Sequence, residues 1–228
     1  MKYSTILFDL DGTLFDYDAA ETQALINTFN DFDLPFFNSN IETYRKLNAI
    51  LWLQFEQGLI TQDVIKVLRF KQLGEALKLD FDAEKFGYRY LEHLSEGTQL
   101  IDGAAELIKF LSQRTDLVLI TNGLSIVQRP RIKNSGLDKY FEEIIISEEV
   151  GSAKPDAKMF DIAFERLDFP DKKKTLIVGD SLTSDIAGGS NYGIDTCWFN
   201  PAGTAGDVNI RCTYTIKTLN ELRDIILK

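Results

Sequence analysis

The sequence predicts an α/β protein in which a doubly wound parallel sheet carries an inserted, all-helical segment. A short β-type apolar run stands alone at residues 4–9. The stretch that follows, 19–94, contains no convincing strand and has the apolar spacing of helices. After Gly97, short runs of β-branched and aromatic residues alternate with helical patterns, which is typical of a parallel sheet covered by helices on both faces.

Short β-type runs at five places are the expected strands, and helical patterns lie between them. The apolar residues of 104–111 recur at the i, i+3, i+4 and i+7 positions of an amphipathic helix. This alternation predicts a Rossmann-like core. The expected strands are residues 4–9, 117–121, 144–147, 175–179 and 196–199.

The helical stretch is predicted to form four amphipathic helices. Ser39 and Glu42 have the spacing of a capping box, which predicts the start of the second helix. Because this stretch separates the first strand from the rest of the sheet, it is interpreted as an insertion. The expected division is an α/β core of residues 1–15 and 96–228 with a helical insertion at 16–95.

The composition predicts a folded chain and excludes several partners. Of the 228 residues, 44% are hydrophobic and 26% are charged, which is enough to form a core. The 25 Lys and Arg against 35 Asp and Glu give a net charge of −10. No basic face is therefore expected for a nucleic acid polymer or an anionic membrane.

Two cysteines and one histidine are too few for a disulfide framework and make a poor set of zinc ligands. The longest purely apolar run, 49–53, is far too short to cross a membrane, and Asp9 interrupts the apolar start of the chain before a signal peptide could form. The expected location is therefore the cytoplasm.

Polar side chains gather where the predicted strands end. Ligands of a doubly wound sheet bind beyond the carboxyl ends of its strands, so these residues are candidates for one site. Carboxylates crowded together repel one another unless a cation compensates them, and oxygen ligands favour Mg2+. The candidates are Asp9, Asp11, Thr121, Asn122, Gly123, Lys154, Asp180 and Asp185.

Asp9 and Asp11 have a spacing with a specific chemical use. In an extended chain, residues i and i+2 point the same way, so both carboxylates can face one substrate atom. A magnesium ion, a lysine and a Thr/Asn loop suit a phosphoryl group. Asp9 is placed to attack phosphorus and form an aspartyl phosphate, and Asp11 to protonate the leaving oxygen and then activate water.

Four motifs, taken together, resemble those of the haloacid dehalogenase-like (HAD) hydrolase superfamily. They are Asp9-Leu-Asp11-Gly-Thr13, Thr121-Asn122-Gly123, Lys154-Pro155 and Gly179-Asp180-x4-Asp185. The helical insertion is similar to the small α-helical cap of that family. Thr121-Asn122-Gly123 alone is only a turn and Lys154-Pro155 alone only a helix start, so their order along the chain carries the resemblance.

The resemblance implies a role for each candidate residue. Asp9 would be the nucleophile and Asp11 the acid/base. Asp9, the Asp11 backbone carbonyl and Asp180 would hold Mg2+. The phosphoryl group would be held by Thr121, Asn122, Gly123 and Lys154, and Asp185 would orient Lys154 or a metal-bound water.

A finer resemblance concerns the substrate. The segments 16–21, 146–151, 184–189 and 196–200 look like those of the pyrimidine 5′-nucleotidases of this superfamily. The resemblance implies a nucleoside monophosphate as substrate. The protein is expected to be a monomer or a homodimer. Members of that group often have a second Asp where this chain has Gly12, which is a departure from their pattern.

Other activities stay open at this stage. A broad-specificity sugar-phosphate phosphatase is the main alternative. A phosphomutase is disfavoured because no histidine precedes His93, and a haloacid dehalogenase because Asp11 and Asp180 are both present. A non-enzymatic binding module is disfavoured because neither the nucleophile nor a metal ligand is missing.

Overall fold

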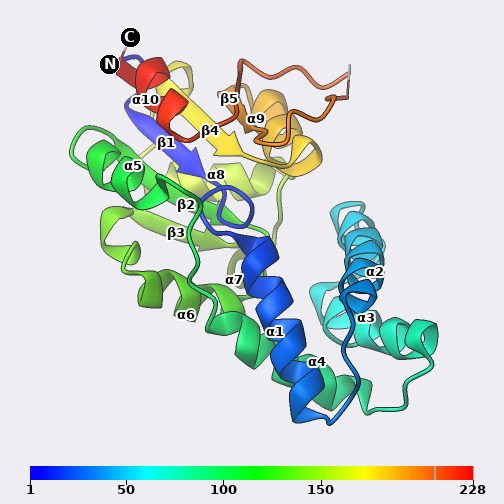
Figure 1. Cartoon of the computed structure of the whole chain (residues 1–228). Helices are drawn as coiled ribbons and strands as arrows, with labels where there is room; N and C mark the ends of the chain where they lie inside the picture. The colour runs from blue at the N-terminus through cyan, green and yellow to red at the C-terminus, as the bar shows by residue number, and fades with distance from the viewer. Residues whose placement is uncertain (208, 228) are drawn as a thin grey trace. The chain divides into compact units, whose positions relative to one another are not determined.

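The computed structural model describes residues 1–207 and 209–227, and its core is a parallel sheet (Figure 1). Within the described chain the sheet has six strands in the order β3-β2-β1-β4-β5-β6. All neighbouring strands are parallel. The strands are β1 (Thr5–Phe8), β2 (Asp116–Thr121), β3 (Glu143–Ile146), β4 (Thr175–Gly179), β5 (Asp195–Phe199) and β6 (Tyr214–Ile216).

Strand β1 lies at the centre of the sheet and determines where the site forms. Phe8, its last residue, pairs with Leu119 of β2 and with Val178 of β4. The chain runs from β1 toward β3 on one side and toward β6 on the other, so the order of strands reverses beside β1. The predicted doubly wound sheet is confirmed, and its switch point is where such sheets bind ligands.

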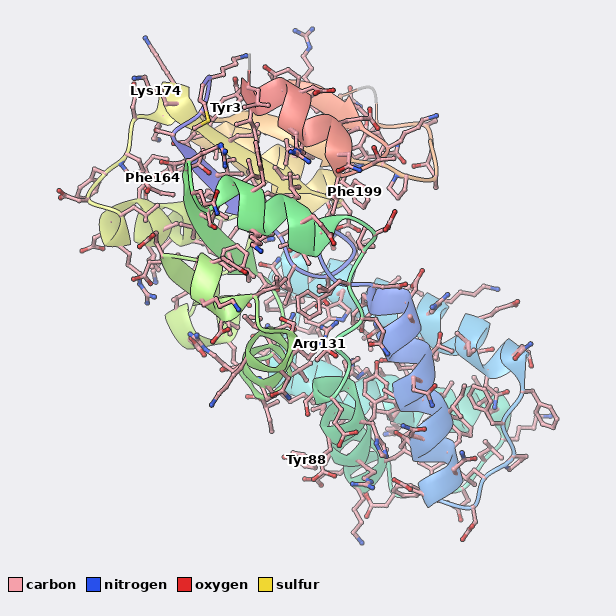
Figure 2. The ribbon with its side chains drawn as sticks, turned by 60° about the vertical axis from the view of Figure 1, so that its left-hand side comes forward. Tyr3, Tyr88, Arg131, Phe164, Lys174 and Phe199 are labelled. Carbon is pink, nitrogen blue, oxygen red and sulfur yellow. The ribbon has the colours of Figure 1, made fainter. Side chains whose placement is uncertain are left out.

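Both faces of the sheet are buried, as parallel sheets require. Alternate strand residues point to opposite faces: Ile6 and Phe8 pack with α5 and α10, whereas Leu7 packs with α8. Phe199 of β5 and Phe164 of α8 belong to these two apolar clusters (Figure 2). The helices are α5 (Ala104–Leu111), α6 (Ser125–Ser135), α7 (Ser147–Val150), α8 (Ala157–Arg166), α9 (Ala187–Tyr192) and α10 (Asn220–Leu227).

The predicted helical stretch forms four helices around an aromatic core. Phe29, Tyr44, Phe70, Phe86 and Tyr90 are fully buried, and their rings contact one another. Every helix among the described residues is too short or too polar to span a lipid bilayer. The four are α1 (Tyr17–Asp31), α2 (Asn38–Glu56), α3 (Gln62–Leu77) and α4 (Ala83–Ser95).

The chain divides into two compact units, which we call the sheet unit and the helical unit. The helical unit contains residues 18–97 together with 126–131 of α6, and the sheet unit contains the rest. The sequence-based division at 16–95 did not include the segment from α6, because that segment is distant along the chain. The role of the helical unit as a cap stays a prediction.

The predicted capping box at Ser39 and Glu42 is wrong. Helix α2 already begins at Asn38, its N-cap is Phe37, and no side chain caps it. The Asn40 side-chain amide donates to the Pro35 carbonyl, at 3.3 Å, and this contact holds the start of the helix. Ser39 therefore lies inside the first turn, where its side chain cannot act as the cap.

Candidate active site

Asp9 is the first residue after β1 and lies almost buried at the switch point. Its backbone N–H donates to the Val178 carbonyl of β4, at 2.9 Å, so the chain is still tied to the sheet. One carboxylate oxygen accepts from Lys154 Nζ, at 2.7 Å, and the other from Thr13 Oγ1, at 3.2 Å. These contacts orient the carboxylate before any ligand arrives.

Lys154 is fully buried and joins three segments of the sheet unit. Its ammonium donates to Asp9 Oδ1, to Asp185 Oδ1 at 2.6 Å and to the Ile120 carbonyl at 2.7 Å. Its three protons thus have three acceptors. Burial alone lowers the pKa of Lys154, but the carboxylates of Asp185 and Asp9 outweigh it and hold that pKa above its ordinary value. The lysine is therefore charged.

Three carboxylates surround this single ammonium group. Oxygen atoms of Asp9, Asp180 and Asp185 all lie within 4.8 Å of one another. The pKa of Asp9 is raised to about 7, because burial, together with the charges of Asp185 and Asp11, outweighs the opposing effect of Lys154. Loss of hydration at its carboxylate, followed by repulsion from Asp9 and Asp185, raises the pKa of Asp180 well above its ordinary range, although the residue as a whole is exposed.

Two glycines make room for these carboxylates. At Gly179, a β-carbon would lie 2.2 Å from the Asp185 carboxylate, and at Gly12 it would lie 2.4 Å from Asp180 Oδ2. Gly12 also has a φ of 81°, which side chains rarely tolerate. Carboxylates thus approach the backbone closely at both motif glycines, and a side chain at either position would require the carboxylate to move.

The loop after β2 is tied to the loop that carries Lys154. The Asn122 side-chain amide donates to the Lys154 carbonyl and its oxygen accepts from the Lys154 N–H, each at 2.8 Å. The Thr121 hydroxyl accepts from the Gly123 N–H at 3.2 Å. The Asn122 side chain therefore holds the lysine loop, and the predicted phosphoryl contacts of residues 121–123 stay predictions.

Asp185 and Asp11 occupy different positions around the cluster. Asp185 is buried in a π-helical turn, Leu182–Ile186, and its second oxygen accepts from the Ser181 N–H at 3.1 Å. Asp11 is half-buried, and its charge contributes to the raised pKa of Asp9. The structure thus brings Asp9, Lys154, Asp180 and Asp185 together from separate segments, while the roles assigned to them stay predictions.

Sequence reasoning missed Trp198 as part of this region. Its indole N–H donates to the Asp180 carbonyl at 2.8 Å. Trp198 of β5 pairs with Gly179 of β4, and Asp180 is the residue that follows Gly179. The signal that could have found it was a large residue with a polar N–H near the carboxyl end of a predicted strand.

Comparison with known proteins identifies the class of enzyme that this fold and site define. The chain belongs to the haloacid dehalogenase-like hydrolase family, whose model matches residues 3–193. Membership of the predicted family is therefore confirmed.

Three relatives match nearly the whole chain. The HAD-hydrolase YfnB of Bacillus subtilis is 41% identical and covers 99% of this chain and 96% of its own length. Pyrimidine 5′-nucleotidase YjjG of Escherichia coli is 35% identical over the full length of both chains. Pyrimidine 5′-nucleotidase PynA of Streptococcus pneumoniae is 35% identical and covers 100% of this chain and 97% of its own.

A crystal structure of YfnB bound to magnesium superimposes on this chain with a TM-score of 0.94 at 41% identity and covers 99% of both chains. That agreement confirms the predicted fold class, a doubly wound sheet with an inserted helical segment.

Proposed function

We propose that this protein is a Mg2+-dependent phosphomonoester hydrolase that works through an aspartyl phosphate on Asp9. One observation carries the proposal: the Asp9 carboxylate is held by Lys154, 2.7 Å away, and lies beside Asp180 at the edge of the sheet where ligands bind. A carboxylate held in this way is oriented for attack on an electrophile.

The residues fit a magnesium ion. Mg2+ prefers carboxylate and carbonyl oxygens, and Asp9 and Asp180 offer such oxygens within 4.8 Å of each other. The Lys154 ammonium pairs with Asp9 and Asp185, and Asp180 lies within 4.8 Å of both, so three acids stand against one cation and a bound metal ion would stabilise their ionised forms. Asp9, Asp180 and the Asp11 backbone carbonyl would hold the ion. When bound, it would supply positive charge for the oxygens of the phosphoryl group.

The first half-reaction transfers the phosphoryl group to Asp9. A carboxylate oxygen of Asp9 forms a bond to phosphorus while the ester P–O bond breaks, and Asp11 gives its proton to the leaving oxygen. The Thr121 hydroxyl, with backbone N–H groups of the same loop, would orient the phosphoryl oxygens. Lys154 would contact one of them in exchange for one of its present acceptors.

The second half-reaction regenerates the enzyme. Asp11, now ionised, takes a proton from water as the water oxygen attacks phosphorus. The bond between phosphorus and Asp9 breaks, inorganic phosphate leaves, and Asp11 is protonated again. The Lys154 ammonium compensates the charge returned to Asp9, to which it is already hydrogen-bonded.

The proposed substrate is a nucleoside 5′-monophosphate with a pyrimidine base. Two relatives that align over the entire chain are named pyrimidine 5′-nucleotidases, which supports this substrate over a sugar phosphate. Because the protein has a net charge of −10, local positive charge from the ion and Lys154 would have to attract a phosphate ester.

Phosphate release from a panel of nucleoside monophosphates and sugar phosphates tests the proposal, with Mg2+ and with a chelator. We expect pyrimidine nucleotides to give the highest kcat/KM. Chelation should lower the rate at least about 100-fold, and added Mg2+ should restore it. Equal turnover of sugar phosphates would favour a broad phosphatase. Full activity after complete chelation would show that Asp180 does not act as a ligand of an essential metal ion.

A further inference from the structure

We propose that Trp198 is a positioning residue for Asp180, holding the loop after β4 so that the Asp180 carboxylate stays beside Asp9. This inference rests on the proposed function, in which Asp180 helps to bind Mg2+. Trp198 does not touch the reacting atoms in this scheme; it acts through the backbone of Asp180.

The contact is direct and partly buried. The indole N–H donates to the Asp180 carbonyl at 2.8 Å, and Trp198 is 8% exposed. A hydrogen bond with reduced access to water is stronger than a fully exposed one. The bond therefore resists movement of the Asp180 carbonyl.

The same peptide group is held at its other end. The Asp180 carbonyl and the Ser181 N–H belong to one planar peptide unit. Trp198 binds its oxygen, and Asp185 Oδ2 accepts from its N–H at 3.1 Å. These two hydrogen bonds restrain rotation of the plane, and with it the backbone from which the Asp180 side chain projects.

Contacts on either side complete this restraint. A β-carbon at Gly206 would lie 3.2 Å from the Trp198 ring, so the loop beyond β5 packs closely against the indole. On the side of the first motif, the backbone at Gly12 lies so close to the Asp180 carboxylate that a β-carbon there would be 2.4 Å away. Trp198 is thus itself fixed, and Asp180 has little room to move.

The experiment separates the N–H group from the bulk of the ring. Trp198→Phe removes the donor and keeps an aromatic side chain on β5. Phe199→Leu is the control, since the neighbouring Phe199 is also buried but packs on the opposite face of the sheet. Mg2+ binding is measured by calorimetry on each full-length protein, with thermal unfolding recorded in parallel.

We expect Trp198→Phe to raise the Kd for Mg2+ about fivefold, the factor for one lost neutral hydrogen bond, and to lower kcat at subsaturating Mg2+. Saturating Mg2+ should recover most of the activity. Phe199→Leu should lower the Tm at least as much as Trp198→Phe does. Its Kd for Mg2+ should stay within about twofold of the wild-type value.

Tryptophan fluorescence gives an independent readout. The chain has two tryptophans, so Trp52→Phe leaves Trp198 as the only one, and Trp198→Phe leaves Trp52. We expect the emission of Trp52→Phe to change as Mg2+ is added and the emission of Trp198→Phe to stay constant.

Two results would overturn the inference in distinguishable ways. If wild-type protein binds no Mg2+, the proposed metal site fails and the role of Trp198 fails with it. If wild-type protein binds Mg2+ and Trp198→Phe binds it equally well, or if Phe199→Leu weakens binding to the same extent, the proposed function stands and Trp198 is only a core residue.

Discussion

The sheet unit buries the cationic side chain of Lys154 and the helical unit those of Arg69 and Arg131, and the surroundings of Lys154 and Arg69 differ. Lys154 in the sheet unit is 1% exposed and contacts two carboxylates, Asp9 and Asp185. Arg69 in the helical unit is also 1% exposed, but its guanidinium carbon lies 4.9 Å from the ring centre of Phe70 and of Tyr90. Aromatic faces, rather than acids, form much of its surroundings.

Arg69 also forms hydrogen bonds with neutral groups. It donates to the Tyr44 hydroxyl at 3.1 Å and to the Asn48 side-chain oxygen at 3.4 Å. Its charge also lowers the pKa of Glu21, although burial of that acid has the larger, opposite effect. In the helical unit, the buried cation of Arg69 contacts side chains of α2, α3 and α4. In the sheet unit, the acids outnumber the cation, and this excess is what a metal ion can use.

The largest expected effect is that of Asp9→Asn, which removes the nucleophile from the acidic cluster. The amide cannot form an aspartyl phosphate, so kcat should fall at least about 10³-fold. The Tm should not fall, because one of three crowded carboxylates has been neutralised. Phosphate release and thermal unfolding of the same preparation check both statements. Turnover near the wild-type rate would show that Asp9 is not the nucleophile.

Lys154→Met tests the sheet-unit half of the comparison. Two buried carboxylates lose their partner, which should destabilise the fold by about 3–5 kcal/mol. We expect kcat/KM to fall by about 10²–10³-fold in the molecules that remain folded. Urea unfolding and steady-state kinetics provide the two numbers. A variant that loses stability but keeps its kcat/KM would show that Lys154 has only a structural role.

Arg69→Met is the counterpart in the helical unit. It removes the hydrogen bonds to Tyr44 and Asn48, so we expect a loss of about 1–3 kcal/mol in the free energy of unfolding. Because Arg69 belongs to the helical unit and the acidic cluster to the sheet unit, kcat/KM should stay within about threefold of wild type. A 100-fold loss of kcat/KM in this variant, measured on protein shown to be folded, would erase the contrast between the two units.

Gly12→Ala is expected to act through the metal site. Its methyl group would lie 2.4 Å from Asp180 Oδ2 at a φ of 81°, so the carboxylate must move. We expect the Kd for Mg2+ to rise about tenfold, because a displaced ligand costs more than one neutral hydrogen bond.

Gly58→Ala is a matched control for this change. Gly58 has a φ of 70° and no atom near its potential β-carbon, so it carries similar backbone strain without the carboxylate contact. Calorimetric titration with Mg2+ should leave Gly58→Ala unchanged. Equal weakening in both variants would attribute the effect to backbone strain alone.

The smallest expected effect concerns an exposed ion pair of the helical unit. His93 and Arg89 bond to Asp31 and lower its pKa. An acid whose pKa is lower in the folded state stabilises the fold above its unfolded pKa and loses this effect as the pH falls through the folded value. Asp31→Asn should therefore lower the Tm slightly at pH 7, and the difference should shrink below about pH 4. A difference that is constant with pH would contradict this origin.

Local sequence patterns predicted most of the sheet. The runs at 4–9, 117–121, 144–147, 175–179 and 196–199 each contain a strand or overlap it closely, because burial on both faces selects β-branched and aromatic residues. Strand β6 was not predicted. It has three residues, one of them exposed, and only its pairing with β5 defines it.

The location of the candidate site could be predicted as far as the ends of the strands could be predicted. Parallel strands bring their carboxyl ends to one edge, so residues after β1 and β4 could be expected near one another without any coordinates. The partners of each side chain could not be read in the same way. Asn122, expected at a phosphoryl group, holds the backbone of Lys154, because the loops that carry them meet at hydrogen-bond distance.

The sequence by itself determined the order of strands and helices, the family, and which acids could meet, since these depend on local periodicity and on motifs of a few residues. Only the tertiary structure decided that Lys154 contacts Asp9 and Asp185 together, that the backbone at Gly12 lies against the Asp180 carboxylate, and that Trp198 binds the Asp180 carbonyl. Such contacts join residues far apart along the chain, and a shift of one or two ångströms abolishes a hydrogen bond that no local pattern records.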